Sequence, residues 1–235
     1  MYSKYKDLFI DFDDTLYDTY GNAVIALGEL FRHFNLGRFF SSEEQFTSPY
    51  WKTNVELWDQ YAHGQISRDY LMVERFRRPL AVAMPEPSAE FCLQVSDVFL
   101  DLCSQKSGVV PGAHALMEHL KARGYGLHLC SNGFHEVQYR KLRASNLLDF
   151  FDNVILSEDA GANKPSPDFF AFALRKSGAN PDSTLMIGDN LSTDIRGAMN
   201  SGIDAMFFNR FPDHPADVHD VKYVVTSLDQ IRQIL

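Results

Sequence analysis

Cysteine is scarce in this chain of 235 residues, which has only Cys92, Cys103 and Cys130. The number is odd and the spacing matches no metal-binding motif, so neither a disulfide framework nor a cysteine-based metal site is expected. Cys92 and Cys103 fall on one predicted helix, about 16 Å apart at about 1.5 Å per residue, which is too far for a bridge. We predict three buried thiols in a protein of a reducing compartment.

Long apolar runs are missing as well. No stretch reaches the roughly 18 consecutive apolar residues that a membrane-spanning helix needs, and the first residues lack the charged and then apolar pattern of a secretory signal. Hydrophobic residues make up 45% of the chain and charged residues 23%, which is ordinary for a globular protein. We expect a cytoplasmic protein with no membrane partner.

Positive charge is in short supply. The chain has 22 Lys and Arg against 31 Asp and Glu, for a formal net charge of −9. This balance disfavours binding to a nucleic acid polymer, which is a polyanion. A small anionic substrate remains compatible with it, provided that the site supplies positive charge locally. The sequence leaves the oligomeric state open.

Residues 17–106 carry helical patterns only. Ser67 and Ser88 are predicted N-caps of two helices, and residues 54–61 predict a shorter helix that ends near Gly64. The first helix is expected to bury a stripe with the 3.6-residue period, made of Tyr20, Val24, Leu27, Phe31 and Phe34. No strand pattern interrupts this region.

Strand and helix patterns alternate in the rest of the chain. Short apolar runs predict strands at residues 7–10, 126–130, 153–157, 184–188, 205–208 and 223–225. Ser166 and Ser192 are predicted N-caps of two of the helices between them. This alternation predicts an α/β fold with a doubly wound parallel sheet. We expect a core formed by residues 1–16 and 107–235, with residues 17–106 inserted as a helical cap domain.

Three aspartates, Asp11, Asp13 and Asp14, follow the first predicted strand directly. Asp11 and Asp13 can face the same side, because the pleat of a strand has period two. A single aspartate at a strand end is common in a structural role. Three within four residues are hard to explain that way, since like charges repel and burial of unpaired charge is costly. A bound cation would resolve this conflict, so a catalytic or metal-binding role is indicated.

Polar residues also follow three of the later predicted strands. Taken alone, Ser131 and Asn132 could form a turn, Lys164 could be a solvated surface charge, and Asp194 could favour the start of a helix. In a doubly wound sheet, however, the carboxyl ends of the strands border one crevice. These residues and Asp189 are therefore expected to lie near Asp11 and Asp13.

The order of these motifs resembles that of the haloacid-dehalogenase-like hydrolases. The four signatures of that family are similar to Asp11-Phe12-Asp13-Asp14-Thr15, Ser131-Asn132, Lys164-Pro165, and Gly188-Asp189 with Asp194. The helical insert after the first strand is similar to the helical cap of the family. The resemblance spans essentially the whole chain, and the combination is specific although each motif alone is weak.

The resemblance implies phosphoryl transfer through an aspartyl-phosphate, with Asp11 as the nucleophile. It also implies a Mg²⁺ cofactor held by the Asp11 carboxylate, the Asp13 backbone carbonyl and Asp189. Asp194 would lie beside this metal and orient a metal-bound water.

Two further roles follow from the same resemblance. Lys164 would neutralise the nucleophile and the phosphoryl charge. The Ser131 hydroxyl, together with backbone N–H groups near Phe12 and Asn132, would hold phosphoryl oxygens. The implied substrate is a small phosphomonoester.

Asp13 separates two classes of enzyme. A phosphatase needs a group that protonates the leaving oxygen and then deprotonates water, and we expect the pKa of Asp13 to be raised for this by its carboxylate neighbours. The dehalogenases of the family lack an aspartate here and do not need the metal. We therefore predict a phosphomonoesterase. A haloacid dehalogenase and a phosphomutase are alternative enzymes, and a non-catalytic binding protein on this fold is the alternative outside enzymes.

Indications of the substrate come mainly from the predicted cap. Its run of Asn54, Leu57, Trp58, Tyr61, Gly64 and Ile66 resembles that of the pyrimidine 5′-nucleotidases of the family, as do residues 132–134 and 223–228. An aromatic ring can stack on a base and an amide can pair with its polar edge. Packing of Trp58 and Tyr61 inside the cap is the alternative. A pyrimidine nucleoside 5′-monophosphate is the candidate substrate.

Overall fold

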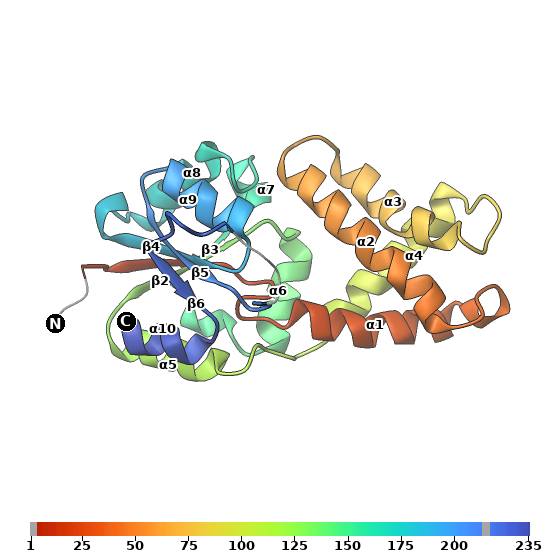
Figure 1. The fold of residues 1–235 in the computed structure, drawn as a ribbon, viewed down its shortest axis with the longest axis horizontal. Coiled ribbons are helices and arrows are strands. Elements are labelled where there is room, and N and C mark those ends of the chain that lie inside the picture. The colour runs from red at the N-terminus through yellow and green to blue at the C-terminus, as the bar shows by residue number, and fades with distance from the viewer. Residues whose placement is uncertain (1–3, 213–216) are drawn as a thin grey trace. The chain divides into compact units, whose positions relative to one another are not determined.

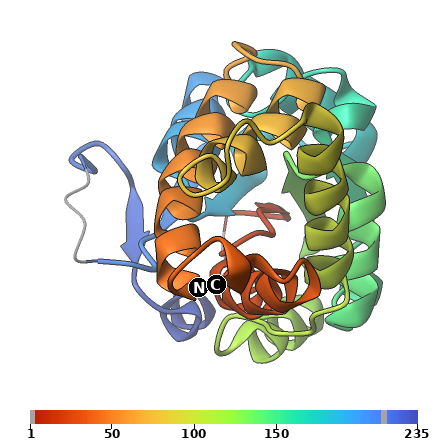
Figure 2. The same ribbon diagram turned by 90° about the vertical axis from the view of Figure 1, so that its right-hand side faces the viewer.

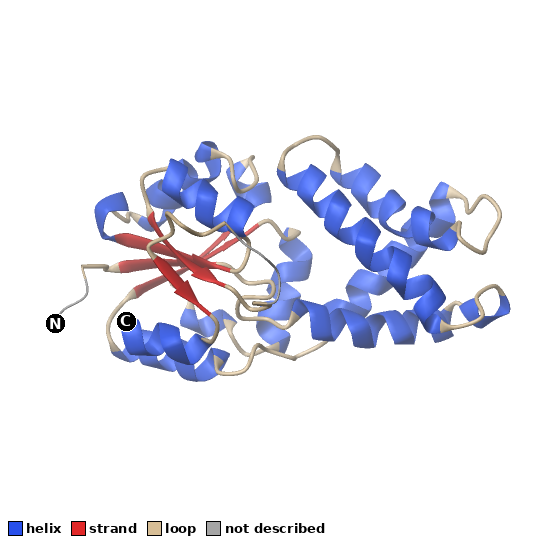
Figure 3. Ribbon diagram, in the orientation of Figure 1, coloured by secondary structure: helices blue, strands red, loops and turns tan. Residues whose placement is uncertain are grey.

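A computed structural model describes residues 4–212 and 217–235. The chain divides into two compact units: residues up to Thr19 together with Ser107–Leu235, and the insert Tyr20–Lys106. The first unit contains the sheet, and the second is helical (Figures 1 and 3). None of the helices in the described chain combines the length and hydropathy of a membrane-spanning segment.

The first unit is built on a six-stranded sheet in which every pair of neighbouring strands is parallel. The strand order is β3-β2-β1-β4-β5-β6, so the order along the chain reverses at β1. This reversal is the switch point at which doubly wound sheets place their sites. The predicted fold class is confirmed. The strands are β1 (Asp7–Ile10), β2 (Gly126–Ser131), β3 (Asn153–Leu156), β4 (Thr184–Gly188), β5 (Asp204–Phe208) and β6 (Tyr223–Val225).

Helices cover both faces of this sheet (Figure 1). Along β1 the side chains alternate: Leu8 and Ile10 belong to the apolar cluster of α5 and α10, whereas Phe9 belongs to the cluster of α8 and α9. Each face of β1 therefore packs against its own apolar core, which explains why consecutive residues of this strand are apolar. The helices are α5 (Ala113–Ala122), α6 (His135–Ala144), α7 (Ser157–Ala160), α8 (Pro167–Ser177), α9 (Gly197–Asn200) and α10 (Leu228–Ile234), with a π-helix at Leu191–Arg196 and 3₁₀ turns at Leu148–Phe150 and Pro181–Ser183.

The insert contains α1 to α4, and no residue of Tyr20–Lys106 lies in a strand. An aromatic cluster forms its core: the Phe76 ring lies 5.2 Å from that of Tyr50, 5.3 Å from that of Phe99 and 6.5 Å from that of Phe46. These residues come from three helices, so the cluster ties the helices together. The helices are α1 (Thr19–His33), α2 (Glu43–Ala62), α3 (Arg68–Leu80) and α4 (Ala89–Ser104), with a 3₁₀ turn at Leu36–Arg38.

Capping serines set the starts of three helices as expected. Ser67 accepts a hydrogen bond from the Tyr70 N–H, Ser88 from that of Phe91, and Ser166 from that of Asp168. Each removes one of the unsatisfied N–H groups at a helix start. The three cysteines are free and buried, as predicted.

Two helix predictions for the insert are correct only in part: residues 54–61 are helical, and Leu27 and Phe31 of the expected stripe are buried. The helix expected at residues 54–61 is the end of α2, which begins at Glu43 with Ser42 as N-cap and continues through Pro49. Proline weakens the helical pattern at that point, but packing of the long helix outweighs it. In the expected stripe of α1, Tyr20 and Val24 are 48% and 47% exposed. Ala23, Ala26 and Leu30 take the buried face instead.

Candidate active site

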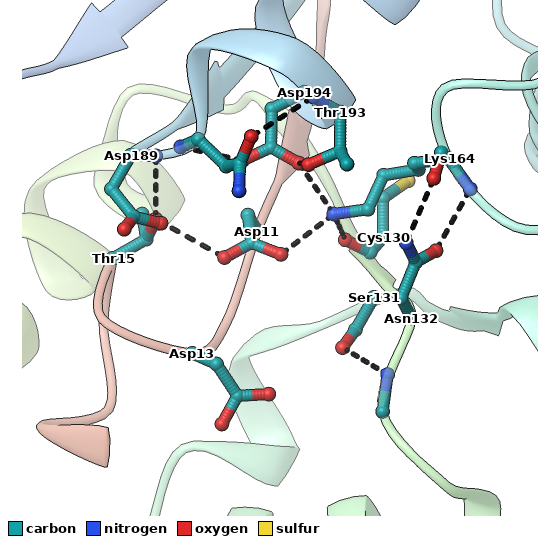
Figure 4. Close-up of polar contacts among 12 residues, drawn as sticks. Asp11, Asp13, Thr15, Cys130, Ser131, Asn132, Lys164, Asp189, Thr193 and Asp194 are labelled. Atoms are coloured by element: carbon teal, nitrogen blue, oxygen red, sulfur yellow. Dashed lines mark hydrogen bonds and ion pairs between the residues drawn. The ribbon is translucent and has the colours of Figure 1, made fainter. Parts of the chain in front are cut away.

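The buried ammonium of Lys164 connects the end of β1 with two other loops of the core. Its Nζ donates to Asp11 Oδ1 at 2.6 Å, to Asp194 Oδ1 at 2.7 Å and to the Cys130 carbonyl at 2.7 Å (Figure 4). Lys164 is 2% exposed. All three protons of the ammonium are used, so the interpretation of Lys164 as a solvated surface charge is wrong.

Asp189 reaches the same cluster through the hydroxyl of Thr15. This hydroxyl lies 3.2 Å from Asp11 Oδ2 and 3.1 Å from Asp189 Oδ1, and it accepts a bond from the Asp189 backbone N–H at 3.1 Å. A hydroxyl has one proton, so it can donate fully to only one of the two carboxylates at a time. Carboxylate oxygens of Asp11, Asp189 and Asp194 all lie within 4.8 Å of one another.

The turn after β4 directs Asp194 back toward the strand. Asn190 Oδ1 accepts from the N–H groups of Ser192 and Thr193, at 3.0 Å each, and is the N-cap of the π-helix. The prediction of Ser192 as N-cap is therefore wrong, because the preceding amide already receives two of the free N–H groups. The Asn190 backbone N–H donates to Asp194 Oδ2 at 3.1 Å, which fixes the carboxylate over Gly188.

Two predicted site residues, Ser131 at the end of β2 and Asn132 directly after it, form different contacts. The Asn132 amide clamps the backbone of Lys164, with Nδ2 donating to the carbonyl at 2.9 Å and Oδ1 accepting from the N–H at 2.8 Å. Its side chain is therefore committed to the loop. The Ser131 hydroxyl accepts from the Gly133 N–H at 3.0 Å and from Gln138 Nε2 at 2.6 Å. Both acceptor positions are used, and its O–H proton remains to be donated.

Asp13 lies apart from the Lys164 cluster, and in Figure 4 its side chain extends away from Asp11. Its Oδ1 accepts from Lys141 Nζ and Thr19 Oγ1, both at 2.6 Å, and its Oδ2 accepts from Gln138 Nε2 at 2.5 Å. The two aspartates of the first motif therefore have separate cationic partners.

A third cation pairs with the rest of the loop after β1. Arg210 donates to Asp14 through Nη1 and to Asp18 through Nη2, the latter at 2.5 Å. Asp14 has a positive φ of 59°, a conformation that aspartate tolerates better than most residues. The negative charge of this loop is thus divided among Lys164, Lys141 and Arg210.

Electrostatics differ sharply among the carboxylates of the cluster. Burial raises the pKa of Asp11 to about 7; the Lys164 ammonium opposes this shift, while Asp194 and Asp13 add to it. Burial and the nearby charges of Asp11 and Asp194 also raise the pKa of Asp189. For Lys164 burial disfavours the ammonium, but the pKa is raised because Asp11 and Asp194 outweigh it. This lysine is a permanent cation.

The expected upward shift for Asp13 is wrong. Burial alone would raise its pKa, but the Lys141 ammonium and the hydrogen bonds from Lys141, Thr19 and Gln138 lower the pKa below its ordinary value. Asp13 is ionised in the free protein, because its nearest charged neighbour is a lysine rather than another carboxylate.

The predicted specificity residues of the insert form local contacts. Tyr50 Oη donates to Asn54 Oδ1 at 3.3 Å. The Trp58 and Tyr61 rings meet edge to face at 5.7 Å, as expected for aromatic residues three apart on a helix. Both are half-buried.

Comparison with known proteins decides the family. Residues 5–202 match the family model of the haloacid dehalogenase-like hydrolases. The chain belongs to this family. The resemblance of its four motifs is thereby confirmed.

The relatives of this hydrolase include two nucleotidases. The chain is 31% identical to the pyrimidine 5′-nucleotidase PynA of Streptococcus pneumoniae, over 89% of this chain and 85% of that protein. It is 27% identical to the pyrimidine 5′-nucleotidase YjjG of Escherichia coli, over 99% and 98%. The HAD-hydrolase YfnB of Bacillus subtilis, solved with magnesium bound, has a TM-score of 0.87 at 27% identity, with 98% of each chain covered.

The acidic cluster of this hydrolase has the chemistry of a divalent-cation site. Asp11, Asp189 and Asp194 offer hard oxygen ligands, and Lys164 neutralises only one of the three charges. Burial of the remaining negative charge is costly without a further cation. A group of ligands made of carboxylate oxygens suits Mg²⁺ rather than a softer metal.

Sequence reasoning missed Thr15, Thr19, Gln138 and Lys141 as parts of the site. A signal for two of them was present. Val137 and Leu142 mark the buried face of α6, and the helical period places Gln138 and Lys141 on that same face. A buried lysine needs an anionic partner, and Asp13 is that partner.

We predict that Gly188→Ala weakens metal binding. A Cβ at this position would lie 2.3 Å from Asp194 Oδ2 and 2.6 Å from its Cγ, so the carboxylate must move. Displaced supporting groups typically lower metal affinity about 10–100-fold, which calorimetric titration with Mg²⁺ would measure. Gly37→Ala is the matched control, because its Cβ would come no closer than 3.6 Å to Phe31. Equal affinity in wild type and Gly188→Ala would contradict the prediction.

Proposed function

We propose that this hydrolase is a Mg²⁺-dependent phosphomonoesterase that acts through an aspartyl-phosphate on a small phosphorylated metabolite. One observation carries the proposal. The ion pair of Asp11 and Lys164 is buried beside two further carboxylates, while Asp13 is held separately by Lys141. A nucleophile and a proton-transfer group thus have different environments, as acid–base chemistry requires.

In the first step an Asp11 carboxylate oxygen attacks phosphorus, and the bond from phosphorus to the leaving oxygen breaks. The attack brings negative charges together, at about 4 kcal/mol per pair for about 4 Å and an effective dielectric of about 20. Lys164 offsets part of this repulsion from its fixed position on Asp11 Oδ1. When bound, Mg²⁺ supplies the remaining charge compensation.

Asp13 moves the proton in both steps. Its proton goes to the leaving oxygen as the electron pair of the broken bond arrives there. In the second step Asp13 takes a proton from the attacking water, the bond from Asp11 to phosphorus breaks, and inorganic phosphate leaves. Because Asp13 is ionised in the free protein, the nearby phosphoryl dianion supplies the like charge that raises its pKa.

Ser131 supports the phosphoryl group in this scheme. Its two acceptor positions are used by Gly133 and Gln138, which leaves its proton for an acceptor such as a phosphoryl oxygen of the substrate. Such a donor is preorganised, because its partners hold it before the charge develops.

The haloacid dehalogenase alternative has less support. It needs no proton-transfer group beside the nucleophile, yet Asp13 is built into the site with three hydrogen-bond donors. The dehalogenases among the structural neighbours are less than 25% identical to this chain, for example 24% with a TM-score of 0.65 and 22% with a TM-score of 0.76, which indicates the shared fold.

A pyrimidine nucleoside 5′-monophosphate is the substrate that we propose. The names of PynA and YjjG support it, as two relatives aligned over most of the chain. A relative from Methanothermobacter thermautotrophicus is named glyceraldehyde 3-phosphate phosphatase and is 28% identical over 98% of this chain. A sugar phosphate is therefore the competing class.

Asp11→Asn is expected to lower kcat on phosphomonoesters at least about 10³-fold, since it replaces the attacking carboxylate with a poorly nucleophilic amide. The fold should survive, because Lys164 keeps Asp194 and the Cys130 carbonyl as partners. Mass spectrometry of acid-quenched wild type should show a phosphoryl adduct that the variant lacks. Asp182→Asn, at an exposed aspartate, is the control. Full activity of folded Asp11→Asn would remove Asp11 as nucleophile.

Stabilisation by Mg²⁺ should grow with pH. Protons and the cation compete for Asp11, whose pKa is raised to about 7, chiefly by burial, and for Asp189, whose pKa is also raised. We expect Mg²⁺ to increase Tm more at pH 8 than at pH 5, measured by calorimetry at one fixed concentration.

The metal-free protein should show the opposite trend, with stability that falls as the pH rises. A carboxylate with a raised folded pKa favours folding at low pH, and its contribution is lost as pH rises toward about 7. Metal-free wild type should therefore lose more Tm than Asp11→Asn between pH 5 and pH 7. Equal losses, together with a pH-independent effect of Mg²⁺, would contradict the electrostatics described for the cluster.

The substrate proposal predicts a kcat/KM for uridine and thymidine monophosphates above that for sugar phosphates and phosphoglycolate. A preference of at least tenfold corresponds to about 1.4 kcal/mol of transition-state discrimination. The measurement is steady-state kinetics on this panel with Mg²⁺. A tenfold preference for a sugar phosphate would overturn the nucleotidase assignment and leave the phosphatase assignment in place.

A further inference from the structure

Three donors meet at one carboxylate beside the candidate nucleophile. Asp13 accepts from Thr19, Gln138 and Lys141 at 2.5–2.6 Å, and each oxygen has at least one partner. Short charge-assisted bonds of this kind are about twice as strong as neutral ones. They hold the carboxylate in one rotamer.

Gln138 links this carboxylate to the Ser131 hydroxyl. Its Nε2 donates to Asp13 Oδ2 at 2.5 Å and to Ser131 Oγ at 2.6 Å. An amide nitrogen has two protons, and each is used once. The proposed proton-transfer group and the proposed phosphoryl donor are therefore oriented by the same side chain.

The fold makes room for this amide. Gln138 is fully buried, and a Cβ on Gly133 would lie 2.2 Å from its Nε2 and 2.4 Å from its Cδ. A larger residue at 133 would push Gln138 away from both partners. The glycine of the loop after β2 is thus required by packing against Gln138.

Lys141 is held in place by an aromatic pair. Its Nζ lies 5.2 Å from the centre of the Tyr17 ring, and that ring stacks on Phe12 at 5.2 Å. Lys141 is 8% exposed. Lys141 and Gln138 are three residues apart on α6, so both reach Asp13 from one helix face.

We infer that Gln138 and Lys141 are positioning residues of the reaction, which fix Asp13 for proton transfer to the leaving oxygen and Ser131 for binding of the phosphoryl group. The inference rests on the proposed phosphomonoesterase function. Neither residue touches substrate in this role. A proton-transfer group must stay within hydrogen-bond reach of the reacting oxygen, and a freely rotating aspartate would spend little time there.

The leaving group provides the test. An alkyl phosphomonoester needs its leaving oxygen protonated, whereas p-nitrophenyl phosphate releases a stabilised phenolate with little need of a proton. Lys141→Met should lower kcat/KM, which reports the step that releases the leaving group, about 10²-fold on the alkyl ester, as loss of acid–base catalysis does, and less than about tenfold on p-nitrophenyl phosphate. Gln138→Met should show the same selectivity and also raise KM for both, because Ser131 is released. Lys141→Arg should recover part of the loss.

A double-mutant cycle separates positioning from stability. If Lys141 acts through Asp13, then Lys141→Met should add little further loss in an Asp13→Asn background. Lys121→Met is the matched control, because Lys121 pairs with Asp152 in the same unit and should show no leaving-group selectivity. Thermal unfolding of every variant checks the fold, and Gln138→Met decides the question if Lys141→Met does not fold.

The possible results distinguish failure of the phosphomonoesterase proposal from failure of the positioning role. Wild type that hydrolyses neither ester contradicts the phosphomonoesterase proposal. An active wild type whose Lys141 and Gln138 variants lose kcat/KM without selectivity for the alkyl ester, or lose it additively with Asp13→Asn, overturns the positioning role alone. Selective loss on the alkyl ester, absent in the Asp13→Asn background, supports it.

Discussion

The site depends on one buried cation. Lys164 is nearly inaccessible, and its three protons are shared among Asp11, Asp194 and the Cys130 carbonyl. Breaking a buried ion pair of this kind costs several kcal/mol, so strand β2 and the segments after β1 and β4 are held to a common point. The Asn132 amide fixes the Lys164 backbone from the other side. The arrangement keeps the candidate nucleophile ionisable in a poorly solvated place.

The two aspartates of the first motif have different electrostatic roles. Burial raises the pKa of Asp11 to about 7, whereas Lys141 and its neighbours lower the pKa of Asp13. Active sites often assign different roles to two carboxylates by environments that shift their pKa values in opposite directions. Here the pKa of Asp13 is lowered, whereas a proton donor would be expected to have a raised pKa. The proposed mechanism therefore uses the charge of the substrate to raise it.

The sheet and most of the site could be predicted from the sequence, because both rest on local patterns. Apolar runs gave the six strands, and motif spacing brought Asp11, Asp189, Asp194 and Lys164 to one sheet edge. The misses have physical reasons. Asn190 precedes Ser192 and takes its capping role. The partner of Asp13 is Lys141, 128 residues away in sequence. The helical period marks Lys141 as buried, but the pairing with Asp13, which sets the charge state of Asp13, depends on tertiary contact that no local pattern encodes.

The pairing of Arg210 with Asp14 and Asp18 changes what the net charge of −9 means. Lys164 pairs with Asp11 and Lys141 with Asp13. Three cations from separate parts of the chain therefore pair with the acidic residues of one loop. An incoming anion meets this local balance rather than the average charge of the surface, since distant charges are screened over about 10 Å in ordinary salt. The excess of acidic residues in the rest of the chain therefore does not conflict with the small phosphate of the proposed substrate, because the charge of the loop is balanced locally.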